Sequence, residues 1–281
     1  MFTWKLHQQL AVFDSPRIMG IINATPDSFV EGHLGRGLDG ILALVAQMRA
    51  DGVDWVDVGG QSTRPGSIRL DAGEEITRVI PVIEAIRNTY PDLPISIDTY
   101  HASVAQAAVQ AGASIVNDVS GGQYDESMLT TVGKLGVPYI LMHAPSMPNT
   151  MHQSLVEKEQ VLESVMRFFR TQIHKAREAG IVDLALDPGF GFGKTPAANF
   201  HLLFALDQLK VLALPVLAGV SRKRMIWQTI GATPETALNG TTALHMLALE
   251  KGATILRVHD VRAAWEARTL WMAVQNGGAT T

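Results

Sequence analysis

The chain has 281 residues, 47% of them hydrophobic, enough to bury a large core in one large domain or two smaller ones. Its formal net charge of -4 gives no overall attraction to nucleic acid or to an anionic membrane, so we expect small-molecule substrates. The absence of cysteine excludes disulfides, thiolate catalysis and cysteine-ligated zinc. No signal-peptide pattern opens the chain and no run of about 18 apolar residues occurs in it, so we expect a soluble, cytoplasmic protein.

Short apolar segments that end in polar residues recur along the whole chain. They are rich in Val, Ile and Leu, as expected for parallel strands that are buried on both faces. Segments with helical periodicity lie between them, for instance 38–52, 72–90 and 156–180, and several end at a glycine, the usual helix stop. The apolar segments are 17–23, 53–59, 94–99, 114–119, 137–143, 182–188, 215–221 and 253–260.

This alternation predicts an α/β fold, a (β/α)₈ TIM barrel, as a single domain over 1–281 in which 1–16 is an N-terminal extension. A doubly wound open sheet has the same alternation. We favour the barrel because polar residues stand at the carboxyl ends of the segments, which converge on one mouth only in a barrel. These residues are Asn23, Asp57, Asp98, Asn117, Asp118, His143, Asp187, Ser221, Arg257 and His259.

The stretch LALDPGFGFGKT (184–195) ends in Gly-Lys-Thr, as phosphate-binding loops do, but it departs from both common nucleotide motifs. A Walker loop needs glycine where this chain has Pro188, and the strict alternation of glycines over 189–193 does not fit a dinucleotide fingerprint. A carboxylate at Asp187, in a closed site, is able to accept two parallel hydrogen bonds from an N–H and an adjacent amine. Guanine-like and pterin rings present such an edge.

Several polar residues have a structural interpretation of equal weight. Asp98 and Asp118 are as typical of helix or turn caps as of ligand contacts. An isolated histidine such as His143 is more typical of a hydrogen-bonded core residue. The sequence has no His-x-Glu-x-x-His or similar cluster, so we expect no structural zinc.

Cations gather near the carboxyl ends of the last two apolar segments. Arg222, Lys223 and Arg224 follow one of them, and we expect at least one of the three to point into the mouth. Arg257 and His259 alternate, so they share one side of their strand, an arrangement typical of an oxyanion or phosphate site.

Seven motifs resemble, in order and position, those of the dihydropteroate synthase family. They extend from about residue 17 to 262 and read NATPDSF, DVGGQSTRPG, SIDT, NDVSGG, DPGFGFGK, GVSRK and RVHDV. The resemblance implies a barrel, usually a homodimer, that joins 6-hydroxymethyl-7,8-dihydropterin diphosphate to 4-aminobenzoate with loss of diphosphate. It also implies transferase chemistry in folate biosynthesis and a target of sulfonamides.

The resemblance further implies roles for the residues at matching positions. Those expected to hold the pterin are Asp98, Asn117, Asp187, Lys223 and Arg257, with Asp187 on the amino-pyrimidinone edge. Those expected at the diphosphate are Asn23, Thr63, Arg64, Arg257 and His259, with Asn23 also at a Mg²⁺ ion. Those expected at the aminobenzoate are Phe29, Thr63, Pro65, Phe192 and Arg224. The catalytic set is Asp98, Asp187, Lys223, Arg257 and His259.

These groups suit an ionisation of the SN1 type. Diphosphate leaves readily only when its developing charge is neutralised, which Mg²⁺, arginine and histidine achieve. The remaining methylene carbon is stabilised by the electron-rich pterin ring and is then captured by the arylamine. We expect the loops at 24–38 and 59–72 to close over the site and exclude water.

The sequence departs from the family pattern at four places. Glu31 stands for an aspartate, Gln61 for a glutamate, Ala144-Pro145 for Met-x-Gly, and Arg224 for a serine that some members have. These changes concern loop closure and the second substrate more than the pterin. Arg224 has the charge to pair with the aminobenzoate carboxylate.

Two other functions remain open from the sequence. A pterin-binding methyltransferase domain shares the barrel and the pterin acids, but it needs a corrinoid partner and no diphosphate site, so Arg64, Arg257 and His259 argue against it. A noncatalytic relative that binds pterin as a regulator is favoured only by the altered first loop around Glu31.

Overall fold

The computed structural model describes residues 2–6, 9–24, 37–61, 70–145 and 155–277. Its centre is a parallel sheet with the strand order β8-β7-β6-β5-β4-β3-β10-β9. A parallel bridge pairs Leu186 with Val216, and the Leu186 N–H donates to Pro215 O at 2.9 Å, so that the sheet closes. The (β/α)₈ barrel is therefore confirmed and the open sheet is excluded. The strands are β3 (Arg17–Asn23), β4 (Trp55–Gly59), β5 (Ile95–Asp98), β6 (Ile115–Asp118), β7 (Tyr139–Met142), β8 (Leu184–Asp187), β9 (Leu217–Ala218) and β10 (Ile255–Val258).

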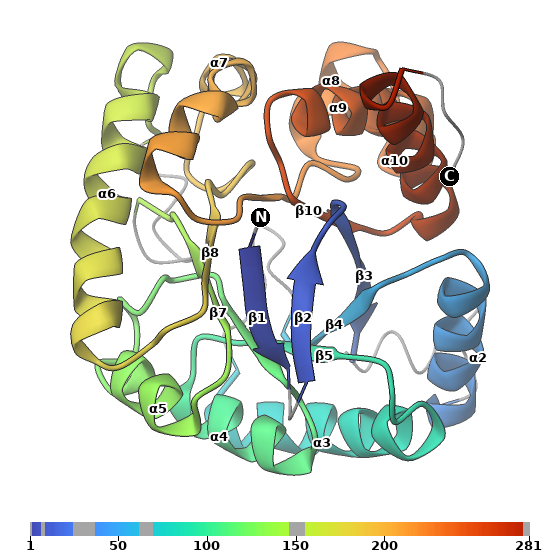
Figure 1. Ribbon diagram of the computed structural model, residues 1–281, viewed down its shortest axis with the longest axis vertical. Coiled ribbons are helices and arrows are strands. Elements are labelled where there is room, and N and C mark those ends of the chain that lie inside the picture. Colours follow the sequence, from blue (N-terminus) through green and yellow to red (C-terminus); the bar gives the residue numbers. More distant parts are fainter. Residues whose placement is uncertain (1, 7–8, 25–36, 62–69, 146–154, 278–281) are drawn as a thin grey trace.

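Helices surround this barrel on the outside (Figure 1). Their ends follow local chemistry: Asp71 accepts a hydrogen bond from the N–H of Glu74 at the start of one helix, and the left-handed Gly112 and Gly136 end two others. None of the helices in the described part of the chain is long and apolar enough to cross a membrane. The helices are α2 (Gly37–Ala50), α3 (Ala72–Thr89), α4 (Ala102–Ala111), α5 (Met128–Leu135), α6 (Lys158–Glu178), α7 (Pro196–Phe204), the 3₁₀ helix η2 (Leu206–Leu212), α8 (Arg224–Thr229), α9 (Leu238–Glu250) and α10 (Val261–Gln275).

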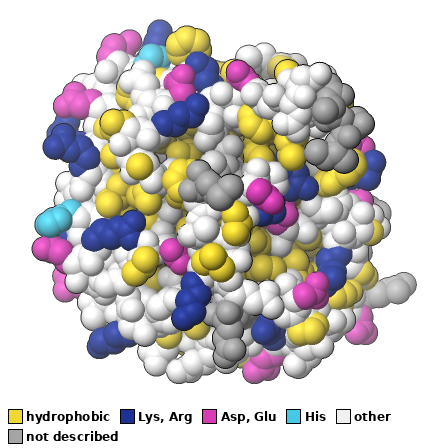
Figure 2. Space-filling model, viewed as in Figure 1, with side chains coloured by type: hydrophobic (Ala, Val, Ile, Leu, Met, Phe, Trp, Pro, Cys, Tyr) yellow, Lys and Arg dark blue, Asp and Glu magenta, His cyan; other side chains and the backbone are white. Residues whose placement is uncertain are grey.

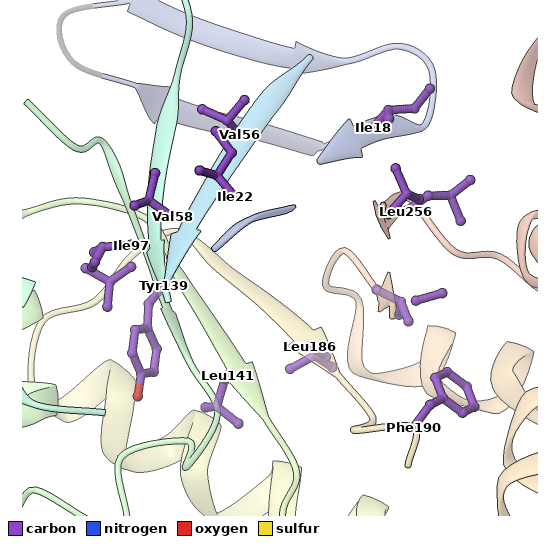
Figure 3. Packing of buried hydrophobic residues seen from close by; sticks show 14 of the residues in the cluster. Ile18, Ile22, Val56, Val58, Ile97, Tyr139, Leu141, Leu186, Phe190 and Leu256 are labelled. Atoms are coloured by element: carbon purple, nitrogen blue, oxygen red, sulfur yellow. The ribbon is translucent and has the colours of Figure 1, made fainter. Parts of the chain in front are cut away.

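The larger core lies between the strands and the helices. Strand residues such as Ile22, Val58 and Leu186 face outward into this layer, where Phe190 also packs (Figure 3). Burying a side chain of this size contributes about 1.5–3 kcal/mol, so the layer holds every helix against the barrel. The barrel is thereby a rigid support for the residues at its ends.

A short antiparallel hairpin, β1 (Phe2–Leu6) and β2 (Gln9–Phe13), covers the amino end of the barrel. Figure 1 shows it in front of the ring of strands. Trp4 is 2% exposed and stacks on Trp55 at 5.4 Å between ring centroids. Figure 2, drawn from this side, shows acidic and basic side chains spread over the face with no large area of one sign. The sequence predicts only an extension over 1–16, and the hairpin is a finding of the structure.

The inside of the barrel changes from apolar to polar along its axis. Under the hairpin lies a layer of apolar side chains from the strands, with Met19, Trp55, Ile115, Ile140, Ala185, Leu217 and Ile255 as members. Residues two positions further along a strand point the same way. Four of those positions carry polar groups: Asp57, Asn117, Asp187 and Arg257. The fold therefore seals one end of the barrel and leaves a polar pit at the other.

Candidate active site

One arginine bridges two carboxylates in the pit. Arg257 of β10 donates from Nε to Asp57 Oδ2 at 2.6 Å and from Nη2 to Asp98 Oδ2 at 2.6 Å. Asn117 of β6 donates from Nδ2 to the same Asp57 oxygen at 3.0 Å. The Asp57 side chain is 0% exposed, whereas Asp98 is 16% and Arg257 20% exposed. Asp57 therefore anchors the arginine from below, and Arg257 and Asp98 are the groups that a ligand reaches.

The charges of this cluster depend strongly on one another. Burial raises the pKa of Asp98 to about 7, and the charge of Arg257 opposes the rise while Asp57 adds to it. Burial disfavours the cation of Arg257, but the carboxylates of Asp57 and Asp98 outweigh it and raise the pKa of the guanidinium. The ionisation of Asp98 therefore depends on the charge of any ligand that binds beside it and Arg257.

Asp187 lies at the end of β8, and its two oxygens have different roles. Oδ1 accepts a hydrogen bond from the N–H of Gly189 at 2.8 Å. Oδ2 lies beside Gly219, where an added Cβ would be 3.8 Å away, and no donor among the described residues reaches it. Burial raises the pKa of Asp187, while the Gly189 hydrogen bond and the charges of Lys223 and Arg257 oppose the rise. One oxygen therefore holds the turn and the other is available to a ligand.

The turn after Asp187 requires glycine. Gly189 has φ +70°, and a Cβ at this position would lie 2.0 Å from the carbonyl oxygen of His143. The turn therefore packs directly against the end of β7, and this contact accounts for the glycine at position 189.

Lys223 is the member of the cationic triplet that faces the pit. Its Nζ lies 4.4 Å from the ring centroid of Phe192. Burial and the charge of Arg257, opposed by Asp187 and Asp98, together lower the pKa of Lys223 to about 8. The expectation that one of the three cations points inward is confirmed.

The preceding residue directs the chain at this point. Arg222 has φ +53°, and its guanidinium makes two hydrogen bonds to Asp260, at 2.9 and 2.6 Å. Its backbone N–H donates to Thr241 Oγ1 at 3.1 Å. Arg222 thus ties the loop after β9 to the end of β10, and this connection brings Lys223 and Arg257 to the same mouth.

His259 stands at the exposed rim of the pit. Its Nδ1 lies 3.0 Å from Ser221 Oγ, which also accepts a hydrogen bond from the His259 N–H at 3.2 Å. Partial burial, followed by the positive charges of Arg257, Arg222 and Lys223, lowers the pKa of His259 to about 4. The imidazole is therefore neutral near pH 7, and an anion bound beside these cations would reverse much of this effect.

Two polar residues at the strand ends are structural. Asp118 accepts hydrogen bonds from the Tyr139 hydroxyl at 2.6 Å and from the N–H groups of Ser120 and Gly122, so it organises the turn after β6. His143 is 2% exposed with Nε2 3.3 Å from Ser164 Oγ, and burial holds its pKa well below the usual value. The structural interpretation is confirmed for both.

The remaining sequence-derived candidates are less closely joined to this cluster. Asn23 ends β3 with an exposed side chain. Arg224 is exposed at the first residue of α8, and its Nε donates to Gln228 at 3.2 Å, so its role at a carboxylate stays a prediction. Gln61 accepts a hydrogen bond from the Tyr100 hydroxyl at 2.8 Å. Phe29, Glu31, Thr63, Arg64 and Pro65 lie outside the described residues.

The donor groups at the mouth fit a metal ion only as a companion of an anionic substrate. Among the described residues, no group of three or more His, Cys, Asp or Glu side chains forms a metal cage. Mg²⁺ commonly takes one or two protein oxygens and completes its shell with phosphate oxygens and water. Asn23, with an exposed amide at the end of β3, fits such a single protein ligand.

Two residues that the structure makes central have no role that the sequence alone indicates. Asp57 was placed at the mouth but not in the site; its signal is a charged residue two positions after Trp55 within a buried strand. Lys194 was considered only as part of a rejected phosphate loop, although it is 5% exposed and its Nζ donates to three carbonyl oxygens. A lysine directly after an alternating glycine turn is the only signal that the sequence offers.

Known proteins are similar to this chain in sequence and in fold. Residues 19–259 match the family model described as pterin binding enzyme. A dihydropteroate synthase of Streptococcus pyogenes serotype M6 is 43% identical over 250 residues, which are 88% of this chain and 91% of that protein. The Xanthomonas albilineans dihydropteroate synthase solved with 4-aminobenzoic acid has a TM-score of 0.89 and 41% identity, and the match covers 97% of this chain and 98% of that one. The same enzyme in complex with 7,8-dihydropteroate has a TM-score of 0.85 and 39% identity, covering 98% and 99% of the two chains. This chain therefore belongs to the dihydropteroate synthases of the pterin-binding enzyme family.

Proposed function

We propose that the pit joins 6-hydroxymethyl-7,8-dihydropterin diphosphate to 4-aminobenzoate, giving 7,8-dihydropteroate and diphosphate. The observation that carries this proposal is the position of Asp187 and of the Asp57–Arg257–Asp98 cluster at one mouth of the barrel. A buried acid for a flat ring and cations for a leaving anion are thereby brought to one place. The two Xanthomonas albilineans complexes name the second substrate and the product of a relative, which supports the same reaction here.

The pterin ring takes its orientation from the bottom of the pit. Asp187 accepts the two parallel N–H groups of the amino-pyrimidinone edge, one on Oδ2 and one on the second lone pair of Oδ1, whose first lone pair accepts from Gly189. Asn117 and Asp98 meet the rest of the ring edge, and Lys223 donates to its carbonyl side. When the pterin ring is enclosed between these groups, water is removed from the pit. Each hydrogen bond to a charged group is then stronger than in solution.

The diphosphate lies toward the rim. Asp57 and Asp98 stabilise the charge of Arg257, and His259 and Asn23 are exposed at the ends of the neighbouring strands β10 and β3. Asn23 would hold Mg²⁺, which would supply additional positive charge beside the diphosphate when bound. These cations stabilise the charge that develops on the leaving group, as preorganised groups in a site of low polarity do.

The reaction then needs no covalent enzyme nucleophile. The bond between the pterin methylene carbon and the diphosphate oxygen breaks first, and its electron pair leaves with the diphosphate. The electron-rich ring stabilises the cationic methylene while the arylamine nitrogen, positioned beside Phe192, forms the new carbon–nitrogen bond. The amine proton is then released to water or to the departing diphosphate.

A direct assay tests this function. Purified protein is incubated with the pterin diphosphate, Mg²⁺ and 4-aminobenzoate, and both diphosphate and dihydropteroate are measured. We expect both products in equal amounts. Pterin binding without any diphosphate release would favour the noncatalytic relative, and diphosphate release without coupling would show a defective aminobenzoate site.

His259 is expected to take up a proton when diphosphate binds. In the free protein, partial burial and the charges of Arg257, Arg222 and Lys223 lower its pKa to about 4, so it is neutral at pH 6. A bound anion cancels those positive charges and raises this pKa. Diphosphate is titrated into the protein at pH 6 in buffers of different ionisation enthalpy, and calorimetry measures how many protons are taken up on binding.

The matched variant is His259→Gln, which keeps a hydrogen-bonding group but does not titrate. We expect wild type to take up more protons on binding than the variant does. The diphosphate's own protonation change is common to both proteins and cancels. Equal counts would show that His259 does not face the anion.

We also propose that the protein forms a homodimer through the outer helices in the last third of the chain. Large exposed apolar side chains occur on α7, η2 and α10 and directly after α8, and Figure 1 shows α7, α8 and α10 along one part of the ring of helices. Such an exposed group is typical of a protein interface. Its members are Phe204, Val211, Ile230, Leu270 and Val274.

A charge placed in this group is expected to dissociate the dimer. Leu270→Asp puts a carboxylate on α10 at a side chain that is 64% exposed, so the monomer folds normally while the interface does not close. Val182→Asp, at a 76% exposed site between α6 and β8, is the control. Sedimentation velocity should give a monomer for Leu270→Asp and a dimer for the wild type and the control. Dimers in all three would place the interface elsewhere.

A further inference from the structure

The lysine of the Gly-Lys-Thr sequence points into the protein. Lys194 is 5% exposed, and its Nζ donates to the carbonyl oxygens of Gly189 at 2.8 Å, Phe192 at 3.1 Å and His143 at 3.3 Å. An ammonium group has three N–H donors and no acceptor, so every donor is used. Lys194 is therefore not available to a phosphate, and the reaction described above does not employ it.

The three carbonyls belong to segments that the site depends on. His143 follows the last residue of β7, and the other two lie in the turn after Asp187. Both backbone polar groups of Gly189 are held: its N–H donates to Asp187 Oδ1, and its carbonyl oxygen accepts from Lys194 Nζ. The Phe192 carbonyl oxygen also accepts from Lys194 Nζ. The centroid of the Phe192 ring lies 4.4 Å from Lys223 Nζ.

The backbone around Lys194 is fixed as well. The Lys194 carbonyl accepts a hydrogen bond from Asn199 Nδ2 at 3.2 Å, and Asn199 Oδ1 accepts one from the N–H of Gly191 at 2.7 Å. Val156 pairs with Lys194 in a parallel bridge. With its own backbone held in this way, the ammonium of Lys194 acts as a fixed point from which the turn is held.

We propose that Lys194 is a positioning residue, whose buried ammonium holds the turn 188–193 so that Asp187 Oδ2 and the Phe192 ring face the same opening. The inference rests on the proposed function, since it takes that opening to receive the pterin and the aminobenzoate. Its effect is also electrostatic. Burial lowers the pKa of Lys194 to about 7 against the charge of Asp187, and in its protonated form Lys194 joins Lys223 and Arg257 in lowering the pKa of Asp187.

The absence of cysteine from the chain allows a precise test of the ammonium. Lys194→Cys introduces a single thiol, which is alkylated in denaturant before refolding. Treatment with 2-bromoethylamine gives a side chain of lysine's length with an ammonium at its end. Treatment with 1-bromopropane gives a neutral side chain of the same length, and wild type carried through the same steps is the control.

Three readings are taken on each protein. They are the melting temperature, kcat and KM for both substrates, and the ¹⁹F resonance of Phe192 in protein labelled with fluorophenylalanine and assigned with Phe192→Leu. We expect the propyl form to lose about 100-fold in kcat/KM, the scale of a misplacement of about 1 Å, and its Phe192 resonance to shift or broaden. The aminoethyl form should recover the wild-type resonance and come within about tenfold of wild-type activity.

The outcomes separate the two proposals. A propyl form with the wild-type resonance and activity would overturn the positioning role, as would equal losses in both alkylated forms that follow a common fall in melting temperature. A resonance that depends on the ammonium, in a wild type that makes no dihydropteroate, would support the positioning role and reject the proposed reaction. If the propyl form does not refold, Lys194→Met, which is expressed directly, takes its place with the same readings.

Discussion

Asp187→Asn is expected to weaken binding of the pterin about 100- to 1,000-fold. The carboxylate oxygen Oδ2 is replaced by an NH₂ group, which faces the N–H donors of the ligand and cannot accept from them. Hydrogen bonds to a charged group contribute about 1.5–3 kcal/mol each, and two of them account for a loss of this size. Equilibrium binding of 6-hydroxymethyl-7,8-dihydropterin, followed by its fluorescence, measures the change.

The same substitution leaves the fold intact. Asparagine retains an oxygen that accepts from the Gly189 N–H, the hydrogen bond that is 2.8 Å long in the wild type. Burial disfavours the charge of Asp187, so its removal costs little stability. The melting temperature should therefore change by only a few degrees, and Asp187→Ala, which loses the Gly189 contact as well, serves for comparison. Unchanged pterin affinity in Asp187→Asn would remove the acid from the site.

Arg257→Gln is expected to lower both stability and diphosphate affinity, for two separable reasons. Arg257 compensates the charge of Asp57, whose side chain is 0% exposed, and leaving one partner of a buried pair alone costs about 3–5 kcal/mol. The lost cation also removes a charge-assisted contact to the diphosphate, so we expect kcat to fall at least 100-fold. Thermal unfolding and steady-state kinetics measure the two effects.

A second substitution distinguishes the two reasons. In Arg257→Gln combined with Asp57→Asn, both charges of the Asp57–Arg257 pair are removed, and Asn117 still has an oxygen at position 57 to which it donates. Stability should return to near that of the wild type while kcat and diphosphate affinity stay low. Recovery of activity together with stability would show that Arg257 serves the fold and does not contact the leaving group.

The barrel was accessible from the sequence because each strand carries two signals at once. A continuous apolar run such as 137–143 indicates burial on both faces, and a polar residue at its end marks the carboxyl edge. The hairpin was not predicted, since the alternation of Trp4, Leu6 and Phe13 becomes meaningful only against the inward-facing Trp55 and its neighbours. Contacts between segments so distant in the chain leave no local pattern.

The site was predictable where a residue type suits one chemistry and lies at a strand end. Asp187 and Arg257 meet both conditions, Lys223 lies in the loop after β9, and the structure brings all three to one mouth. Asp57 and Lys194 act on other protein groups, so their roles depend on three-dimensional contacts that spacing does not reveal. Asp98 and Asp118 show the same limit: both are aspartates at strand ends, yet only Asp98 faces Arg257.

The separate roles of Asp187 and Arg257 are best measured by the binding of two ligands, 6-hydroxymethyl-7,8-dihydropterin and its diphosphate. Each ligand is bound to wild type, to Asp187→Asn and to the double variant Arg257→Gln, Asp57→Asn. If one acid holds the ring and one arginine holds the leaving group, Asp187→Asn loses affinity for both ligands by the same factor. The double variant then loses affinity chiefly for the diphosphate form. Normal binding of either ligand by Asp187→Asn, or equal losses for both ligands in the double variant, would contradict this account.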